Sequence, residues 1–428
     1  MKSFFKKTLQ GILRFLARAI LRKYQPDIIG VTGSIGKTSA KEAIYTVLSH
    51  KFNVRKNIKN FNNEIGLPLT IIGTGSGGRS ICGWFRVVAR ATWLLINKNK
   101  KYPKILVLEM GVDRVGDMKY LTSLAPCRVG VVTNVGPVHL EYFKTIEKIA
   151  KEKSVIVSHL DKNGWALLNA DNEQVLAMKN ATKARVLTYG LSAEAEVRAL
   201  EVNVSQTGEK NIAGLSFKIA YQGSTVPVLL PDVLGEHLIY AALAGVAAGI
   251  IYGINLIDIS QALRNFVSPK GRMRLVPGVR GSIIIDDTYN ASPESTIAAI
   301  RALGQLEAKG KKYAVLGDML ELGEYAESGH RKVGEALVEN DIDVLIAVGG
   351  QAIFIGDQAE KLGLVRKNIF NLANSIEAGD WLMERLAEGD VVLVKGSQGM
   401  RMEKTVKVIM AEPEKAKDLL VRQDKPWR

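Results

Sequence analysis

The stretch Gly30-Val31-Thr32-Gly33-Ser34-Ile35-Gly36-Lys37-Thr38 stands between a strand-like run, residues 27–29, and a helix-like run, residues 39–44. Small residues let backbone N–H groups turn toward phosphate oxygens, and the start of the following helix adds a partial positive charge. Lys37 can reach the β- and γ-phosphates, and the Thr38 hydroxyl can bind Mg²⁺. Val31 occupies the position of the first glycine in the usual P-loop spacing. The stretch therefore predicts a phosphate-binding loop, with an ordinary glycine-rich turn as the alternative.

Length and composition set the class of the protein. The chain has 428 residues, more than one hydrophobic core normally serves, so we expect two or three domains. Cys82 and Cys127 form neither a disulfide framework nor a CxxC pair, which is typical of a reducing cytoplasm. The formal net charge of +15 calls for an anionic partner, such as a nucleotide, a nucleic acid or a membrane surface.

The N-terminal segment carries much of that charge, because residues 1–26 hold seven Lys or Arg and no Asp or Glu. Helical spacing puts Lys7, Arg14, Arg18 and Arg22 on one side and Phe5, Leu9, Ile12, Leu13, Leu16 and Ile20 on the other. The two central arginines interrupt any spanning segment, so we expect a helix lying on the anionic inner face of the cell membrane. Residues 84–101, with Arg86 and Arg90 among apolar side chains, are expected to share that surface. The alternative is a helix that docks its apolar face on the body of the protein.

Alternating apolar runs and helical segments predict an α/β fold. From residue 27 they indicate a largely parallel sheet, and residues 196–228 indicate antiparallel strands added to it. The pattern restarts after residues 268–271. We therefore expect a basic amphipathic helix over 1–26, a central P-loop ATPase domain over 27–267 with an antiparallel appendage, a linker over 268–271, and a Rossmann-like α/β domain over 272–428.

Polar residues follow two of the predicted strands. Glu109 closes the run 105–108, and His139 follows the run 129–132. Because ligands bind at the carboxyl edge of a parallel sheet, these side chains could hold Mg²⁺ against a triphosphate. A solvated or structurally hydrogen-bonded role is the alternative for each residue.

Nine motifs between residues 27 and 408 resemble the Mur ligase family. In the first half they are 33–42 (GSIGKTSAKE), 60–68 (NFNNEIGLP), 109–111 (EMG), 134–140 (NVGPVHL) and 169–172 (NADN). In the second half they are 271–273 (GRM), 286–293 (DDTYNASP), 315–324 (VLGDMLELGE) and 394–402 (VKGSQGMRM). The second set is similar to the branch of the family that adds D-alanyl-D-alanine to UDP-N-acetylmuramoyl-tripeptide.

That resemblance implies ATP-dependent amide-bond formation in peptidoglycan precursor synthesis. The muramoyl-tripeptide carboxylate attacks the γ-phosphate, and the amine of D-alanyl-D-alanine then attacks the acyl phosphate. It implies that Lys37, His139 and Lys153 are catalytic and that Thr38, Glu109 and His139 hold Mg²⁺. The residues that it assigns to the phosphates of ATP are Thr32, Gly33, Ser34, Ile35, Gly36, Lys37, Thr38 and Ser39.

Lys153 matches the lysine that the family carbamylates, and the carbamate would present a negative oxygen to the metal. Lys151 is the alternative, two residues earlier. In the second domain the resemblance assigns Arg272, Asp287, Tyr289 and Asn290 to the base and ribose, and catalysis is expected to need domain closure. Leu238 and Ala241 stand where family members commonly have asparagines, so the adenine-side contacts from that motif are absent.

The family's separate N-terminal domain, which grips the UDP end of the substrate, is expected to be missing, because the P-loop follows the basic helix almost at once. The acceptor could therefore be UDP-linked or lipid-linked. Two other functions stay open: a ligase like folylpolyglutamate synthase, and a non-enzymatic, nucleotide-gated membrane binder. We expect a monomer and no nucleic-acid partner.

Overall fold

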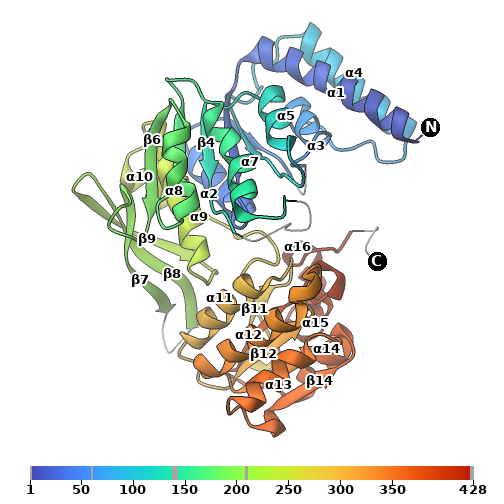
Figure 1. The fold of residues 1–428 in the computed structure, drawn as a ribbon, viewed down its shortest axis with the longest axis vertical. Coiled ribbons are helices and arrows are strands. Elements are labelled where there is room, and N and C mark those ends of the chain that lie inside the picture. Colours follow the sequence, from blue (N-terminus) through green and yellow to red (C-terminus); the bar gives the residue numbers. More distant parts are fainter. Residues whose placement is uncertain (1, 59–60, 137–142, 208–210, 425–428) are drawn as a thin grey trace. The chain divides into compact units, whose positions relative to one another are not determined.

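The computed structural model describes residues 2–58, 61–136, 143–207 and 211–424 (Figure 1). The chain forms two compact units. The first comprises Met1–Val202, Phe217–Val228 and His237–Phe266, and the second comprises Asn203–Ser216, Leu229–Glu236 and Val267–Arg428. The last change of unit, between Phe266 and Val267, lies next to the predicted linker 268–271.

The sheet of the first unit is parallel at its centre. Strand β1 (Asp27–Thr32) lies between β3 (Ile105–Glu109) and β4 (Val129–Val132) and pairs in parallel with both. The parallel ladder continues through β2 (Val54–Lys56) on one side and through β5 (Trp165–Asn169) and β6 (Arg185–Gly190) on the other. The residues of β3 and β4 are all buried, as expected for strands covered by helices on both faces. The mixed α/β fold predicted from the sequence is confirmed.

Three long strands extend this sheet at the β6 edge. They are β7 (Val197–Thr207), β8 (Asn211–Tyr221) and β9 (Ser224–Pro231), in that order. Only two residues join β8 to β9, Gln222 and Gly223, and both have positive φ, 46° and 77°. A two-residue turn with positive φ at both positions joins antiparallel strands. The turn of this hairpin lies within residues 196–228, the stretch for which the sequence predicted antiparallel strands.

Helices cover the sheet and set the position of the loop after β1. Helix α2 (Lys37–Ser49) packs against α9 (His237–Ile251), where a Cβ on Gly245 would come within 3.0 Å of the Ala43 backbone. Glycine at this point lets the two helices approach closely. The other helices of this unit are α3 (Gly66–Ile72), α4 (Ile81–Ile96), α5 (Asp117–Leu124), α7 (Ile146–Ser158), α8 (Glu173–Leu176) and α10 (Leu256–Leu263).

Helix α1 (Lys2–Tyr24) docks on this unit, beside α3 and α4 (Figure 1). Leu13, Ala17 and Ile20 are buried in the same apolar core as α3 and α4. The Lys23 ammonium donates hydrogen bonds to the carbonyls of Leu94, Leu95 and Asn97 at the end of α4, at 2.7–3.0 Å. Most of the apolar face that the sequence predicted for a membrane therefore contacts protein, as the docking alternative requires. The side chain of Phe5 lies outside the described residues.

The second unit has its own six-stranded sheet, in the order β10-β11-β15-β12-β13-β14. Strand β10 (Arg274–Pro277) pairs antiparallel with β11 (Ile283–Asp287), and the remaining pairs are parallel. The other strands are β12 (Lys312–Gly317), β13 (Val344–Val348), β14 (Ile369–Leu372) and β15 (Val391–Lys395). The helices are α11 (Pro293–Gly304), α12 (Ala326–Glu339), α13 (Ile353–Lys361), α14 (Ser375–Arg385), α15 (Glu403–Ile409) and α16 (Ala416–Leu419).

Candidate active site

The loop between β1 and α2 has a backbone that needs glycine. Gly33 and Gly36 have φ values of 154° and 82°, and a Cβ on Gly33 would collide with the Thr133 hydroxyl. Two residues that follow β4 brace the loop: Thr133 Oγ1 donates to the Ile35 carbonyl at 2.6 Å, and the Asn134 carbonyl accepts from the Ser34 N–H at 2.8 Å. The loop is thus held in one shape at the start of α2, where helix N–H groups favour an anion.

Lys37 lies over this loop. Its ammonium donates to the carbonyls of Gly33 and Ser34, at 2.7 and 3.1 Å. The Ser34 hydroxyl bonds to the backbone of Gly136, and the Thr32 hydroxyl donates to the Met110 carbonyl. The predicted phosphate-binding residues are therefore gathered at one sheet edge, although the Thr32 hydroxyl is hydrogen-bonded to Met110, the residue that follows β3.

The predicted metal ligands Thr38 and Glu109 are in contact. The Thr38 hydroxyl donates to Glu109 Oε2 at 3.0 Å, because α2 begins beside the end of β3. Asn62 Nδ2 donates to the other carboxylate oxygen at 3.3 Å. Hydroxyl and carboxylate oxygens are ligands that Mg²⁺ prefers, so this pair fits the ion. His139, the third predicted ligand, lies outside the described residues.

Lys41 is a member of this cluster that the sequence reasoning missed. Its ammonium is buried, 3.4 Å from Glu109 Oε2 and 3.5 Å from Glu42 Oε1. Glu42 in turn pairs with Lys56. Lys41 follows Thr38 by three residues, a spacing that puts both side chains on one face of a helix. That spacing was the available signal in the sequence.

Lys153 faces the same loop from α7. It is 2% exposed, and its ammonium donates to the Gly33 carbonyl at 3.1 Å. Burial, followed by repulsion from Lys37, lowers the pKa of Lys153 to about 7. The alternative residue, Lys151, is exposed. Of the two lysines, Lys153 has the burial and the position that a role beside the phosphates requires.

The side chain of Asn134, at the same sheet edge, has a buried oxygen that a ligand could satisfy. Among the residues that the structure describes, its side-chain oxygen Oδ1 is buried without a hydrogen-bond partner. A buried amide oxygen without a donor costs free energy. A bound substrate that offers an N–H or O–H group here would remove that cost.

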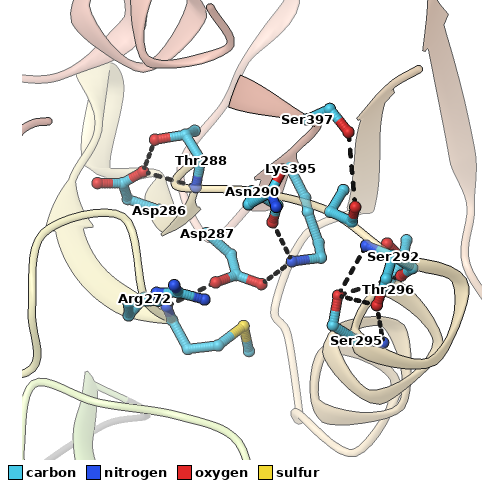
Figure 2. A network of polar contacts seen from close by, with 12 residues as sticks. Arg272, Asp286, Asp287, Thr288, Asn290, Ser292, Ser295, Thr296, Lys395 and Ser397 are labelled. Carbon is cyan, nitrogen blue, oxygen red and sulfur yellow. Dashed lines mark hydrogen bonds and ion pairs between the residues drawn. The ribbon is translucent and has the colours of Figure 1, made fainter. Parts of the chain in front are cut away.

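A second cluster lies in the other unit, at the ends of β11 and β15 (Figure 2). The Lys395 ammonium pairs with Asp287 Oδ2 at 2.6 Å and donates to the Asn290 carbonyl at 2.9 Å. Both charged groups are buried, and burial lowers the pKa of Lys395 although Asp287 opposes the shift. Asp287 also accepts from the Met273 N–H at 3.2 Å. Asp287 was predicted to bind the nucleotide, but both of its carboxylate oxygens bond to other groups of the protein.

Asp286 joins the predicted linker to the sheet. Its carboxylate accepts from the Thr288 hydroxyl at 2.6 Å and from the Gly271 N–H at 3.1 Å. Burial raises the pKa of Asp286 to about 6, while the bonds from Thr288 oppose the shift. This carboxylate fixes the chain beside Arg272, which lies to the lower left of Asp287 in Figure 2.

Arg272 and Tyr289 are in contact, and Asn290 follows Tyr289 in the same turn. The Arg272 guanidinium lies 4.2 Å from the centre of the Tyr289 ring, and Asn290 Oδ1 accepts from the Gln398 N–H at 3.3 Å. Arg422 was missed by the sequence reasoning. It donates to the carbonyls of Thr288 and Tyr289 and pairs with buried Glu403 at 3.0 Å, which supports this turn from far along the chain.

Comparisons with known proteins place these two clusters in one family. Residues 92–249 match the Mur ligase middle domain, and residues 271–398 match the Mur ligase, glutamate ligase domain. The UDP-N-acetylmuramoyl-tripeptide--D-alanyl-D-alanine ligase of Bacillus subtilis is 32% identical over 401 residues, which cover 94% of this chain and 79% of that protein.

Solved structures agree with this match. The MurF ligase of Thermotoga maritima in complex with ADP superposes with a TM-score of 0.76 at 29% identity, covering 95% of this chain and 84% of that one. Folylpolyglutamate synthase of Mycobacterium tuberculosis, at 14% identity and a TM-score of 0.63, shares the fold alone. By its sequence matches over both units, this chain belongs to the Mur ligase family.

Proposed function

We propose that this chain is an ATP-dependent ligase that joins D-alanyl-D-alanine to the muramoyl-tripeptide in peptidoglycan precursor synthesis. The observation that carries the proposal is the loop after β1. Lys37 and buried Lys153 both donate to the Gly33 carbonyl, and Thr38, which follows Lys37, contacts Glu109. Its relative in Bacillus subtilis bears the name of that activity, and its relative from Thermotoga maritima was solved with ADP.

The residues suit transfer of a phosphoryl group to a carboxylate. Such a reaction needs positioning and charge neutralisation more than covalent help from the protein. Lys37 and the start of α2 would bind the phosphates, while Thr38 and Glu109 would hold Mg²⁺, with His139 as a third ligand. Mg²⁺, when bound, neutralises charge on the phosphate oxygens. The acyl phosphate formed from the tripeptide carboxylate would then react with the amine of D-alanyl-D-alanine, releasing phosphate.

Lys153 would act as a carbamate. Its low pKa keeps much of the amine neutral near pH 7, and a neutral amine attacks CO₂ through its lone pair, forming an N–C bond and releasing one proton. The carbamate is negative, whereas the ammonium form of Lys153 is positive, so the modification reverses the charge beside Lys37. This reversal removes the repulsion that lowers the lysine pKa and supplies a further oxygen for the metal.

The second unit would supply the contacts to the base and ribose. Arg272 stacked on Tyr289 offers a cation and a ring, and the 286–290 turn holds both in place through Asp286 and Lys395. Because the assigned nucleotide residues are divided between the two units, we expect domain closure to precede chemistry. Asp287 then acts by holding Lys395 rather than by touching the nucleotide.

The test is ADP release by the purified chain with Mg·ATP, UDP-N-acetylmuramoyl-tripeptide and D-alanyl-D-alanine, with the product mass read in parallel. We expect the mass of the pentapeptide product, and its loss in Lys37→Ala with the fold retained. Addition of glutamate to a folate instead would favour the ligase like folylpolyglutamate synthase. ATP binding without ADP release or product with any acceptor would contradict the ligase proposal.

The acceptor and the place of work are finer proposals. We propose that the middle and C-terminal units contact the peptide part of the acceptor. We also propose peripheral association with the anionic inner face of the membrane through residues 1–26 and 84–101, and a monomeric enzyme. Among the described residues, no helix combines the length and apolarity that crossing a bilayer needs. Parallel assays with UDP-linked and lipid-linked tripeptide would show which acceptor is used.

A further inference from the structure

Helix α4 is apolar on the face that points away from the protein. Its inner residues Val87, Ala91 and Leu94 are buried in the core. Ile81, Phe85 and Ile96, separated by 4 and 11 residues, lie on the opposite face and are 85%, 74% and 75% exposed. A single exposed apolar residue is normal on a protein surface, but several large ones on one face indicate an interaction site.

Helix α1, which contacts α4, also exposes an apolar side chain. It lies beside α4 in Figure 1, and the bonds from Lys23 to the end of α4 fix the two helices together. Phe15 of α1 is 72% exposed, although its neighbours Leu16 and Ala17 are buried. The exposed apolar side chains of α4, together with Phe15 of α1, are called the α1–α4 surface below.

The positive charge of the chain is concentrated around this surface. Residues 1–26 and residues 73–104 each contain seven Lys or Arg and no Asp or Glu. The net charge of the whole chain is +15, so the remaining sequence is almost neutral. Arg86, Lys98, Lys100 and Lys101 are exposed on or just after α4. The positive charge therefore favours an anionic partner. The exposed apolar side chains between the basic residues favour a partner that also has an apolar part.

We propose that the α1–α4 surface binds the headgroup region of an anionic lipid bilayer. Aliphatic Ile81 and Ile96 gain nothing from the phosphates of a nucleic acid but are stabilised in the acyl boundary, where basic side chains meet anionic headgroups. A second copy of the chain would bring like charges together. The inference deepens the peripheral association proposed above. It assigns the contact to the outer face of α4 and to Phe15, in place of the α1 face that packs on the protein.

Vesicle binding by the full chain tests this assignment. We expect co-sedimentation with vesicles of phosphatidylglycerol and phosphatidylcholine, and little with phosphatidylcholine alone. The triple variant Ile81→Ser, Phe85→Ser, Ile96→Ser should lower the partition coefficient at least about tenfold. The matched control replaces three exposed apolar residues of the second unit, Ile353→Ser, Leu362→Ser and Val365→Ser, and should leave it unchanged.

Cysteine labelling gives a second readout. Cys82 is exposed on α4, whereas Cys127 is buried and its pKa is raised to about 12, so a thiol-reactive, environment-sensitive dye should label Cys82. The emission of the attached dye should shift to the blue when the protein binds anionic vesicles, because the dye then enters a less polar environment. Equal binding by wild type and the α4 triple variant, with no spectral shift, would overturn the assignment while leaving membrane association standing.

The outcomes separate the proposals. If wild type ignores anionic vesicles, the membrane proposals both fail, and the ligase assay on soluble substrates is unaffected by that result. The α4 triple variant should keep wild-type turnover of the UDP-linked substrate. If turnover is absent in both proteins while the wild type binds vesicles and the α4 triple variant does not, the ligase proposal fails and the surface assignment stands.

Discussion

Lys153 combines burial with a neighbouring positive charge, and its pKa sets a pH dependence. With a pKa of about 7 instead of 10.5, the neutral fraction of the amine rises about tenfold between pH 6 and pH 8. At constant dissolved ¹³CO₂, we expect the carbamate signal in ¹³C NMR to rise over that interval and to be absent in Lys153→Arg. Lys151→Arg is the control and should keep the signal. A signal that survives in Lys153→Arg but not in Lys151→Arg would assign the modification to the other lysine.

Lys41 offers a test of how Glu109 is held. Lys41→Met leaves a buried carboxylate without its nearest cation, so we expect the free energy of unfolding of the first unit to fall by about 3–5 kcal/mol. The Mg²⁺ concentration needed for half-maximal turnover should also change. Lys51→Met is the control, because Lys51 pairs with Asp258 at the surface, where water and salt screen the attraction and such a pair contributes little to stability. Equal losses in the two variants, by urea unfolding, would contradict a special role for Lys41.

Residue types at strand ends were predictable, but their partners were not. The motif spacing led to Lys37, Thr38 and Glu109, because a strand, a glycine-rich turn and a helix fix their relative places locally. Arg422 could not be found this way, since its contacts with Thr288 and Glu403 span long stretches of chain. The commitment of Asp287 to Lys395 depends on the pairing of β11 with β15, which no local pattern contains.

At the scale of the element, the docking of α1 makes a stability prediction. Leu13→Ala removes a fully buried side chain, so the free energy of unfolding should fall by about 2–5 kcal/mol. Phe15→Ala, two residues away on the exposed side, should change it by less than about 0.5 kcal/mol. Urea unfolding followed by circular dichroism measures both variants. A small loss for Leu13→Ala would mean that α1 leaves the protein in solution, as a free membrane helix would.

The sequence pattern of residues 1–26 predicted a helix with one apolar face. A membrane and a groove of protein both accept such a face, so the pattern could not say which one it meets. The choice depends on α3 and α4, which follow tens of residues later and complete the core around Leu13 and Ile20. The outer face of α4 was less visible in the sequence, because large apolar residues occur on both its buried side and its exposed side.

At the scale of the whole molecule, the two units divide the assigned nucleotide residues between them, and ligand-induced stabilisation can test this division. A ligand at one hundred times its dissociation constant adds about 2.7 kcal/mol to stability, which corresponds to an increase of about 5–10 °C in the unfolding temperature. We expect this increase with Mg·ATP, its loss in Lys37→Ala, and a reduced increase in Arg272→Ala. Scanning calorimetry resolves the units if they unfold separately.

Arg301→Ala is the control for Arg272→Ala, because Arg301 is an exposed arginine of the same unit on α11. It should keep the full increase in unfolding temperature. If Arg272→Ala also keeps the full increase, the first unit alone binds the nucleotide, and closure is not needed for binding. If Arg272→Ala lowers the increase for both calorimetric transitions, nucleotide binding couples the two units. The phosphate-binding loop lies in one unit. A ligase that uses residues of both units therefore requires that nucleotide binding couple them.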